Sequence, residues 1–263
     1  MGKLIRFEMR KLFRKKSLYI CMAIAFALVA MNVFAVSVLN NSTMPELEGM
    51  AALIYGTTDM SGIWRYQIAG SLSNGSADIL LSVLVSLIVC ESFRSGAAKT
   101  MIARGYSRKK IYFAQYLTAV LTTVLMAMVC WVSSLAVGAI ALKANLIMDS
   151  KLIMCMAAQL VLILVVTSIA FVSSMLSEKT AVGIVCGIMI PAAVSLLLTG
   201  IDHLLAESQI NFSQSQYWIS DMMVRVANTD VEQHVLNQSF LLGGAYSLIL
   251  FFAGFWAFSR KDV

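Results

Sequence analysis

The stretch LIMCMAAQLVLILVVTSIAFVSSML, residues Leu152–Leu176, contains no charged side chain. A helix rises 1.5 Å per residue, so about 20 consecutive apolar residues cross the hydrocarbon core of a bilayer. The surface helices of soluble proteins are apolar along one face only, and their polar residues recur every turn. Leu152–Leu176 therefore predicts a transmembrane helix, and with it an integral membrane protein.

Five more apolar stretches lie on either side of this one. They are Leu18–Leu39, Ile79–Cys90 with a start nearer Ala69, Ile111–Leu142, Ala181–Leu198 and Phe240–Phe258. Polar residues at positions 74–78 interrupt the outer end of the second stretch. The predicted fold class is an all-α membrane protein with six transmembrane helices.

The composition of the 263 residues supports this class. Hydrophobic residues make up 59% of the chain and charged residues 13%, and the mean hydropathy is +0.81. Soluble domains carry about a quarter charged residues, so this chain has too few charges to cover a water-facing surface. A membrane β-barrel would show segments of about ten residues with alternating polarity, and the sequence contains no such series.

The first 17 residues differ from the apolar spans. In GKLIRFEMRKLFRKK, Gly2–Lys16, apolar residues recur near the helical period between cations. Such a segment suits an amphipathic helix that lies in the headgroup plane, and the simpler alternative is a basic flank that only sets orientation. We predict an interfacial helix over residues 1–17, succeeded by a single membrane domain over residues 18–263.

Lysine and arginine positions predict the orientation. With six spans, the N-terminal segment, the loop at 91–110, the turn near Lys179 and the C-terminus share one side, which holds most of the 20 Lys and Arg residues. The positive-inside rule makes that side cytoplasmic, with both termini inside. The net charge of +6 therefore indicates topology and attraction to anionic membrane lipid, and not nucleic-acid binding.

Two segments on the opposite side exceed a simple turn, residues 40–70 and 200–238. Their Trp64, Tyr66, Tyr217 and Trp218 are amphipathic aromatics, which favour the headgroup level. We expect short interfacial helices in both segments, and the lining of an exit gate is the functional alternative.

Motifs for catalysis and cofactors are missing from the sequence. There is no G-x-x-x-x-G-K-[ST] phosphate loop and no H-E-x-x-H metal motif, and His203 and His234 lie far from any acidic cluster. The five Cys lie in or beside apolar stretches without a C-x-x-C pair, as small apolar side chains do. No enzyme activity, cofactor or metal site is predicted on this chain.

The spans are also nearly free of ionisable residues. A proton-coupled transporter keeps Asp, Glu or His at membrane depth, so the sequence argues against coupling through side chains, and Na⁺ coordination by backbone carbonyls stays open. Ser and Thr are frequent instead. Their usual role in a span is hydrogen bonding between helices or back to their own helix.

The loop at residues 91–110 and its continuation to Gln115 read ESFRSGAAKTMIARGYSRKKIYFAQ. Ala97–Ala103 is compatible with a short helix, Gly105 can supply a left-handed C-terminal cap, and Ser107 can cap the next helix. We interpret this pattern as a short helix at the membrane surface, a sharp turn and a return into the membrane. A solvated, lipid-binding loop is the alternative that the composition allows.

Three motifs carry a resemblance to a known family. Phe93–Tyr112, F-R-S-G-x-x-K-T-x-I-x-x-G-x-S-R-x-x-I-Y, resembles the intracellular loop of small ABC-2-type permeases. The N-terminal K-L-I-R-F-E-M-R-K-L-F-R-K-K-S looks like their amphipathic elbow helix, and the closing F-S-R-K-D-V is similar to their C-terminal ending. Together with the six-span layout, the likeness covers nearly the whole chain.

The resemblance implies two kinds of subunit. In that family the loop after the second span is a coupling helix that binds a separate cytoplasmic ATPase, which carries ATP and Mg²⁺. Two permeases, here a homodimer, assemble with two ATPase copies. Carried over by position, the coupling-helix interface comprises Arg94, Gly96, Lys99, Thr100, Arg104, Gly105, Ser107 and Arg108. The elbow residues that add to it are Arg6, Glu8, Arg10 and Lys11.

The size and the elbow are most similar to permeases of bacterial peptide exporters, of the bacitracin- and lantibiotic-immunity types and of the phenol-soluble-modulin type. This implies a bacterial cytoplasmic membrane and an amphipathic or antimicrobial-type peptide as cargo. Ten of the 14 Asp and Glu residues fall on the predicted outer side. This acidic outer face and the 17 Met residues suit such a cargo, although Met is also an ordinary filler of apolar cores.

Candidates for a cargo path are polar positions in the first, second and fifth spans. They are Asn32, Ser82, Ser86 and Ser195, and structural hydrogen bonding is the commoner role for such residues. Pro191 is predicted to break the fifth helix, because proline lacks the backbone donor, and to leave a re-entrant or kinked outer half.

Two other functions stay open. One is a non-transporting membrane anchor or regulatory subunit that recruits a soluble partner through the same loop. The other is export of a different hydrophobic cargo, such as a drug or a lipid.

Overall fold

The structure is a computed structural model that describes residues 2–40, 59–73, 76–142, 149–207, 214–228 and 231–260. Within these ranges every regular element is a helix, and six helices are long and apolar enough to cross a membrane. The prediction of an all-α chain with six such helices is confirmed for this part of the sequence. The helices in chain order are α1 Gly2–Phe13, α2 Lys16–Asn40, α4 Met60–Ala69, η1 Gly70–Leu72, α5 Ser76–Arg94, α6 Ala97–Ala103, α7 Arg108–Ala141, α8 Ser150–Ser177, α9 Thr180–Glu207, η2 Ser215–Tyr217, α10 Ile219–Ala227 and α11 Gln233–Arg260.

The predicted spans correspond to α2, α5, α7, α8, α9 and α11, with some longer boundaries. Helix α9 continues to Glu207 instead of stopping at Leu198, and α11 begins at Gln233 instead of Phe240. Both extensions take residues from the segment 200–238, which also contains η2 and α10. In the segment 40–70 the described part contains α4, and residues 41–58 lie outside the described residues.

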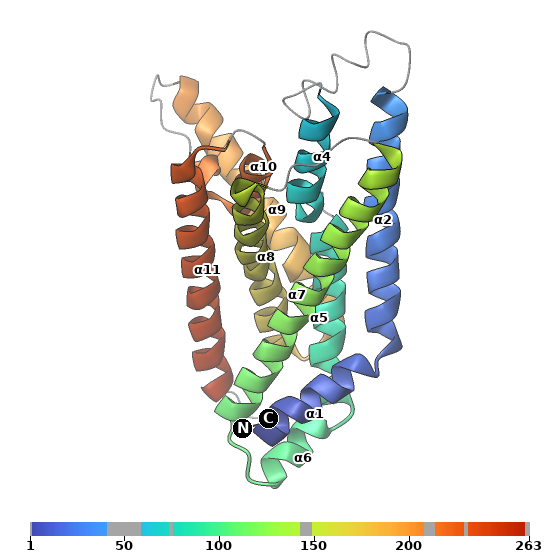
Figure 1. The fold of residues 1–263 in the computed structure, drawn as a ribbon. Coiled ribbons are helices and arrows are strands. Elements are labelled where there is room, and N and C mark those ends of the chain that lie inside the picture. The colour runs from blue at the N-terminus through green and yellow to red at the C-terminus, as the bar shows by residue number, and fades with distance from the viewer. Residues whose placement is uncertain are drawn as a thin grey trace.

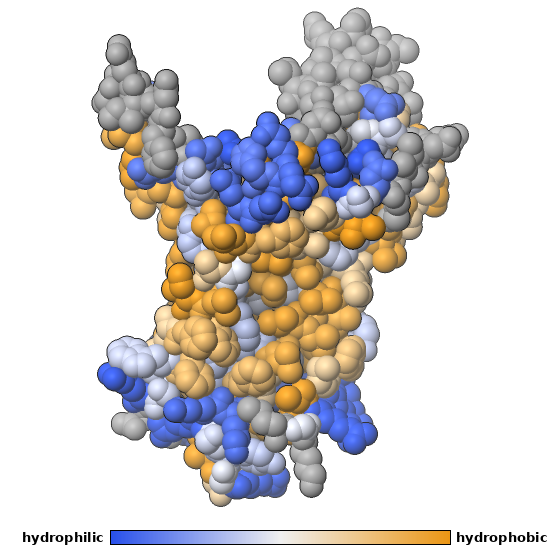
Figure 2. Space-filling model, turned by 60° about the vertical axis from the view of Figure 1, so that its left-hand side comes forward, coloured by the Kyte–Doolittle hydropathy of each residue, from blue (hydrophilic) through white to orange (hydrophobic). Residues whose placement is uncertain are grey.

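The long helices run alongside one another between two ends of a bundle (Figure 1). Helices α1 and α6 and the last turns of α11 lie at one end, here called the α6 end, and α4 and α10 lie at the other, here called the α4 end. The face drawn in Figure 2 has a hydrophobic band across its middle and hydrophilic side chains at both ends. This is the surface that a lipid bilayer with water on both sides requires.

Helix α8 is the centre of the bundle. It contacts α5, α7, α9, α10 and α11, and its Leu162, Ile163 and Ala170 are fully buried. Helices α9 and α11 are the opposite case, because large apolar side chains such as Leu196 and Leu241 are exposed on them. A helix that is apolar all round and only partly covered by protein is suited to contact lipid.

Small polar side chains connect the helices inside the bundle, as the sequence predicted for Ser and Thr. Thr123 Oγ1 of α7 lies 2.8 Å from Thr167 Oγ1 of α8, and Ser174 Oγ of α8 donates to Ser86 Oγ of α5 over 3.0 Å. Ser133 Oγ of α7 donates to the carbonyl of Phe26 on α2 over 3.0 Å. These bonds join four different helices without a charge.

Two glycines on α9 allow it to approach α5 and α8 closely. A Cβ at Gly183 would overlap Ser174 Oγ, and a Cβ at Gly187 would lie 2.6 Å from Ser82 Oγ and 2.9 Å from the Cβ of Ala170. Gly183 and Gly187 form a G-x-x-x-G pair, the spacing that brings membrane helices together. This spacing is visible in the sequence and is a signal for helix contact that the prediction of the spans did not include.

Trp64, one of the outer aromatics expected at the headgroup level, packs against protein. Its side chain is buried between α4 and α7, and its Nε1 donates to the carbonyl of Ser134 over 3.2 Å. The indole occupies the space above Gly138, where a Cβ would overlap the ring. Trp64 is therefore a packing residue that holds α4 against α7.

Pro191 does not break the fifth helix, so that prediction was wrong. Helix α9 runs without interruption from Thr180 to Glu207 with Pro191 inside it. Pro191 is buried, and its carbonyl accepts a hydrogen bond from Trp218 Nε1 over 3.0 Å. Trp218, which directly precedes α10, thus ties α9 to the α10 segment at the level of the proline.

The packing of Trp64 on Gly138 generates a test of the fold. We expect Gly138→Ala to lower the stability by about 1–3 kcal/mol, because the added methyl forces the indole out of its place. The measurement is the thermal unfolding midpoint of the purified protein. Gly244→Ala is the matched control, because a Cβ at this helical glycine meets no atom within 4 Å beyond its chain neighbours and the backbone of its own helix. Equal midpoints for the two variants would contradict the packing role of Gly138.

Candidate functional site

The α6 end contains a short helix bounded by two glycines. Helix α6, Ala97–Ala103, is preceded by Gly96 with φ +66° and followed by Gly105 with φ +82°. Glycine reaches this left-handed region without strain, so the chain can turn sharply out of α5 and again into α7. Ser107 is the N-cap residue of α7, as predicted, although its side chain makes no capping hydrogen bond.

An apolar cluster joins α6 to its neighbours. Leu4 of α1, Met101 of α6 and Ile111 and Ala114 of α7 are buried against one another. Ile5, Ala97, Ile102 and Tyr106 pack around them. Because three helices share this cluster, α6 is held against α1 and α7 and does not project freely from the bundle.

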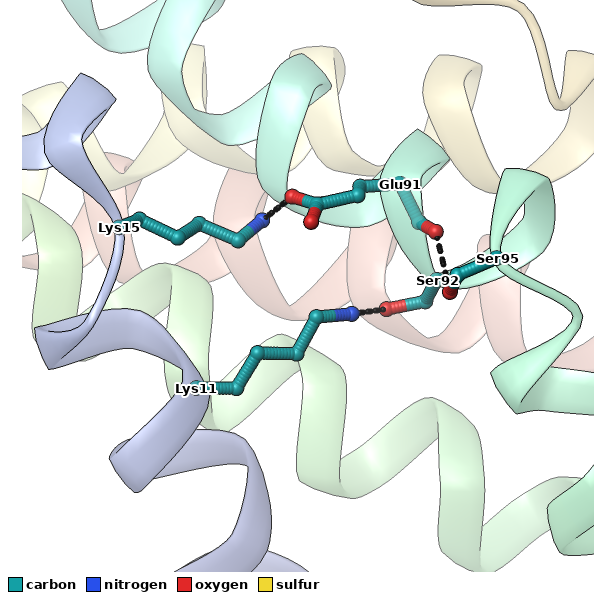
Figure 3. A network of polar contacts seen from close by, with 5 residues as sticks. All are labelled: Lys11, Lys15, Glu91, Ser92 and Ser95. Carbon is teal, nitrogen blue, oxygen red and sulfur yellow. Dashed lines mark hydrogen bonds and ion pairs between the residues drawn. The ribbon is translucent and has the colours of Figure 1, made fainter.

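Polar contacts fix α1 to the end of α5 (Figure 3). Lys11 Nζ donates to Ser92 Oγ over 2.9 Å, and Lys15 pairs with the carboxylate of Glu91. Ser95 Oγ donates to the backbone carbonyl of Glu91 over 2.7 Å. The last turn of α5, immediately before α6, is therefore attached to the segment that begins the chain. No spacing pattern in the sequence predicts a contact between residues so far apart.

Glu8 lies on the inner side of α1. Its side chain is 3% exposed, and burial raises the pKa of its carboxyl group, against the opposing effect of Lys11 and Lys15. Burial also lowers the pKa of Lys15, and the partner Glu91 offsets part of that change. Two acids, Glu8 and Glu91, and two cations, Lys11 and Lys15, therefore lie together where α1 meets α5, partly shielded from water.

The predicted coupling-helix residues surround α6. Arg94, Lys99, Thr100, Arg104, Gly105 and Ser107 are exposed, and Gly96 and Arg108 are half-exposed. A cavity of about 490 Å³ lies between α1 and α6. Its lining residues are Leu4, Phe7, Ala97, Thr100, Met101, Arg104 and Tyr106. The lining combines apolar side chains with the hydroxyl group of Thr100 and one cation, Arg104.

The elbow residues divide into two groups. Arg6 and Arg10 are exposed and Lys11 is half-exposed, so they can contact an adjacent molecule. Glu8 is buried and cannot, so the prediction that it adds to a partner interface was wrong. The amphipathic pattern placed it correctly on the helix but did not show that this polar residue faces inward.

The structure does not bring the four cargo-path candidates together. Ser82 and Ser86 are fully buried where α5 meets α9, Asn32 is exposed on α2, and Ser195 is half-exposed on α9. The two buried serines have a packing role in this protomer.

The aromatic residues of the loop motif and the closing motif pack on one another. Tyr112 is fully buried, and its ring centroid lies 5.8 Å from that of Phe258 and 5.2 Å from that of Phe171. Phe93 contacts Phe258 edge to face at 6.4 Å. The first and last residues of the loop motif and the first residue of the closing motif therefore share one cluster, which attaches α11 to α7 and α8.

These features define the class of protein: an all-helical chain with six helices long and apolar enough for a multi-pass membrane protein, and a structured, cationic loop at one end of its described part. Residues 27–263 match the family described as a protein of unknown function, DUF2705, and the chain belongs to that family. No curated protein matches the chain.

The buried carboxyl group of Glu8 generates a test of this site. Its folded-state pKa lies above the unfolded value of 4.5, so the folded state binds the proton more tightly. This tighter proton binding contributes to the free energy of unfolding. The contribution is fully present below pH 4.5 and is lost as the pH rises through the folded-state pKa of Glu8. We expect Glu8→Gln to raise the unfolding midpoint at neutral pH and to flatten its pH dependence above 4.5.

The control for this prediction is Glu8→Asp, which keeps a carboxyl group at the same place and should keep the pH dependence. The measurement is the thermal unfolding midpoint of the purified protein between about pH 4.5 and pH 8, the range over which a raised carboxyl pKa would act. A Glu8→Gln profile parallel to that of the unchanged protein would contradict the buried position of Glu8.

Proposed function

We propose that this chain is the membrane-spanning permease subunit of an ATP-binding-cassette exporter. It moves amphipathic or antimicrobial-type peptides out of a bacterial cell or its inner leaflet, and a separate cytoplasmic ATPase supplies the energy. Two copies of the permease assemble with two ATPase subunits, and ATP and Mg²⁺ are bound by the ATPase. The α6 end faces the cytoplasm, so that α1 is the elbow helix and α6 the coupling helix.

The observation that carries the proposal is the construction of α6. It is a short helix with exposed Lys99 and Thr100, it is bounded by glycines with positive φ, and it lies between the two long helices α5 and α7. A partner that binds α6 can therefore move both long helices. A loop that only reverses the chain direction needs neither a helix nor two left-handed glycines, since helix connections of a few residues suffice.

The contacts of α6 support the transmission of movement. The cluster of Leu4, Met101 and Ile111 ties α6 to α1 and α7, and the pair of Lys15 and Glu91 ties α1 to α5. A displacement of α6 is thus shared by four helices and cannot be absorbed by a flexible loop. The positive-inside rule supports a cytoplasmic position for this end.

The coupling role can be tested by charge reversal. We expect Lys99→Glu with Arg104→Glu to lower the capture of the partner ATPase about tenfold or more, because an ATPase surface that binds these cations is acidic and like charges across an interface oppose binding. The measurement is co-purification of the ATPase from membranes, together with ATP hydrolysis by the complex. Membrane insertion of the variant should be normal, because both side chains are exposed.

The matched control is Arg225→Glu, which reverses an exposed cation on α10 at the α4 end. This variant should capture the ATPase as the unchanged chain does. Undiminished capture by the Lys99/Arg104 variant, or an equal loss in the control, would show that α6 is not the ATPase contact.

Transport distinguishes this function from that of a membrane anchor. We expect liposomes that contain both subunits to move a fluorescent amphipathic peptide only with ATP, and the Lys99/Arg104 variant to leave it in place. Capture of the ATPase without ATP-dependent peptide movement would instead support a non-transporting anchor or regulatory subunit. If the liposomes move a drug or a lipid instead of the peptide, the proposed cargo class is wrong but the permease function stands.

A further inference from the structure

We infer that the chain has a binding site for the headgroup of an anionic phospholipid between α1 and the end of α5. A cavity of about 340 Å³ lies there, separate from the one between α1 and α6. Its lining residues are Phe7, Arg10, Lys11, Arg14, Lys15 and Glu91. The inference does not depend on the proposed transport function and requires only that the helices cross a membrane.

The charge of the cavity selects an anion. Four cations and one carboxylate line it, and the carboxylate of Glu91 is already paired with Lys15. Arg10 on the last turn of α1 and Arg14 directly after α1 are exposed, and guanidinium groups bind phosphate through two parallel hydrogen bonds. A phosphate group fits this set of donors, whereas a cation or an uncharged cargo does not.

The position of the cavity selects a lipid as the source of the phosphate. The apolar surface of α2 begins one turn after Lys15, where Tyr19 is 55% exposed and Ile20 57%. Phe7 and Phe13 of α1 are also about half exposed, so apolar side chains flank the cations. In a phospholipid the acyl chains lie next to the phosphate, as the apolar side chains here lie next to the cations. A free phosphate ion would occupy the cations but leave the phenyl rings of Phe7 and Phe13 in water.

The residues at the bottom of the cavity are also the ones that attach α1 to α5. Lys11 bonds Ser92, which is 1% exposed, and Lys15 bonds Glu91. A headgroup bound by Arg10 and Arg14 therefore lies on the contacts that attach α1 to α5, one turn before α6. Occupancy by lipid would stabilise this junction.

The test is native mass spectrometry of the purified full-length protein after exposure to equal amounts of phosphatidylglycerol and phosphatidylcholine. We expect the unchanged chain to retain phosphatidylglycerol preferentially. Arg10→Gln with Arg14→Gln should lower this retention about tenfold, because each cation near the surface contributes to the attraction of an anionic headgroup. The matched control is Lys110→Gln with Lys179→Gln, which removes two exposed cations outside this cavity and should retain lipid normally.

A second variant guards against misfolding as an explanation. Glu91→Gln removes the carboxylate from the cavity and frees Lys15 for the phosphate, so retention of phosphatidylglycerol should rise, and a gain cannot come from loss of structure. Unchanged retention in the Arg10/Arg14 variant, an equal loss in the control, or no preference for phosphatidylglycerol would overturn the site. Displacement of the lipid by millimolar inorganic phosphate would overturn the lipid assignment and indicate a soluble anion.

Discussion

The architecture depends on one constraint: a backbone N–H or C=O group in hydrocarbon must be hydrogen-bonded within the protein. A helix meets this need along its whole length, so the chain crosses in helices and makes its sharp turns at the ends of the bundle. Gly96 and Gly105, which have positive φ, are both at the α6 end. The irregular backbone is thereby concentrated where water and partner molecules can reach it.

Within the bundle, close packing replaces the hydrophobic effect as the specific force between helices, because lipid tails are as apolar as Leu and Val side chains. The contacts accordingly use small residues: Gly183 and Gly187 against serines, and Gly138 under the Trp64 indole. Hydroxyl groups such as those of Thr123 and Thr167 bond one another at the centre. Helices α9 and α11, with large exposed apolar side chains, are left for lipid or for another protein.

The α6 end is organised differently, with charge and apolar packing in close contact. The pair of Lys15 and Glu91 and the bond of Lys11 to Ser92 hold α1 against α5, and burial raises the pKa of the neighbouring Glu8 carboxyl group. The two cavities beside α1 differ in their lining residues. Arg104 is the cation that lines the first, next to α6, whereas Arg10, Lys11, Arg14 and Lys15 line the second, next to the end of α5. We propose a protein partner for the first and a lipid headgroup for the second.

Composition and local pattern were enough to predict the class of fold and the turn that follows α6. Long uncharged stretches such as Leu152–Leu176 predict helices long and apolar enough to cross a membrane, and Gly105 was predicted to be left-handed, as it is. These properties depend on the composition of about 20 residues or on the φ of a single residue, which are local quantities. The family resemblance added the proposed roles of α1 and α6.

Packing in three dimensions selected the polar residues that face inward and the helices that touch. It buried Glu8 and Trp64, continued α9 past Pro191 without interruption, and joined Lys15 to Glu91. None of these outcomes could be predicted from the sequence. An almost uniformly apolar helix has little amphipathic pattern to show which face meets its neighbours, so these pairings result from steric fit between helices far apart in the chain.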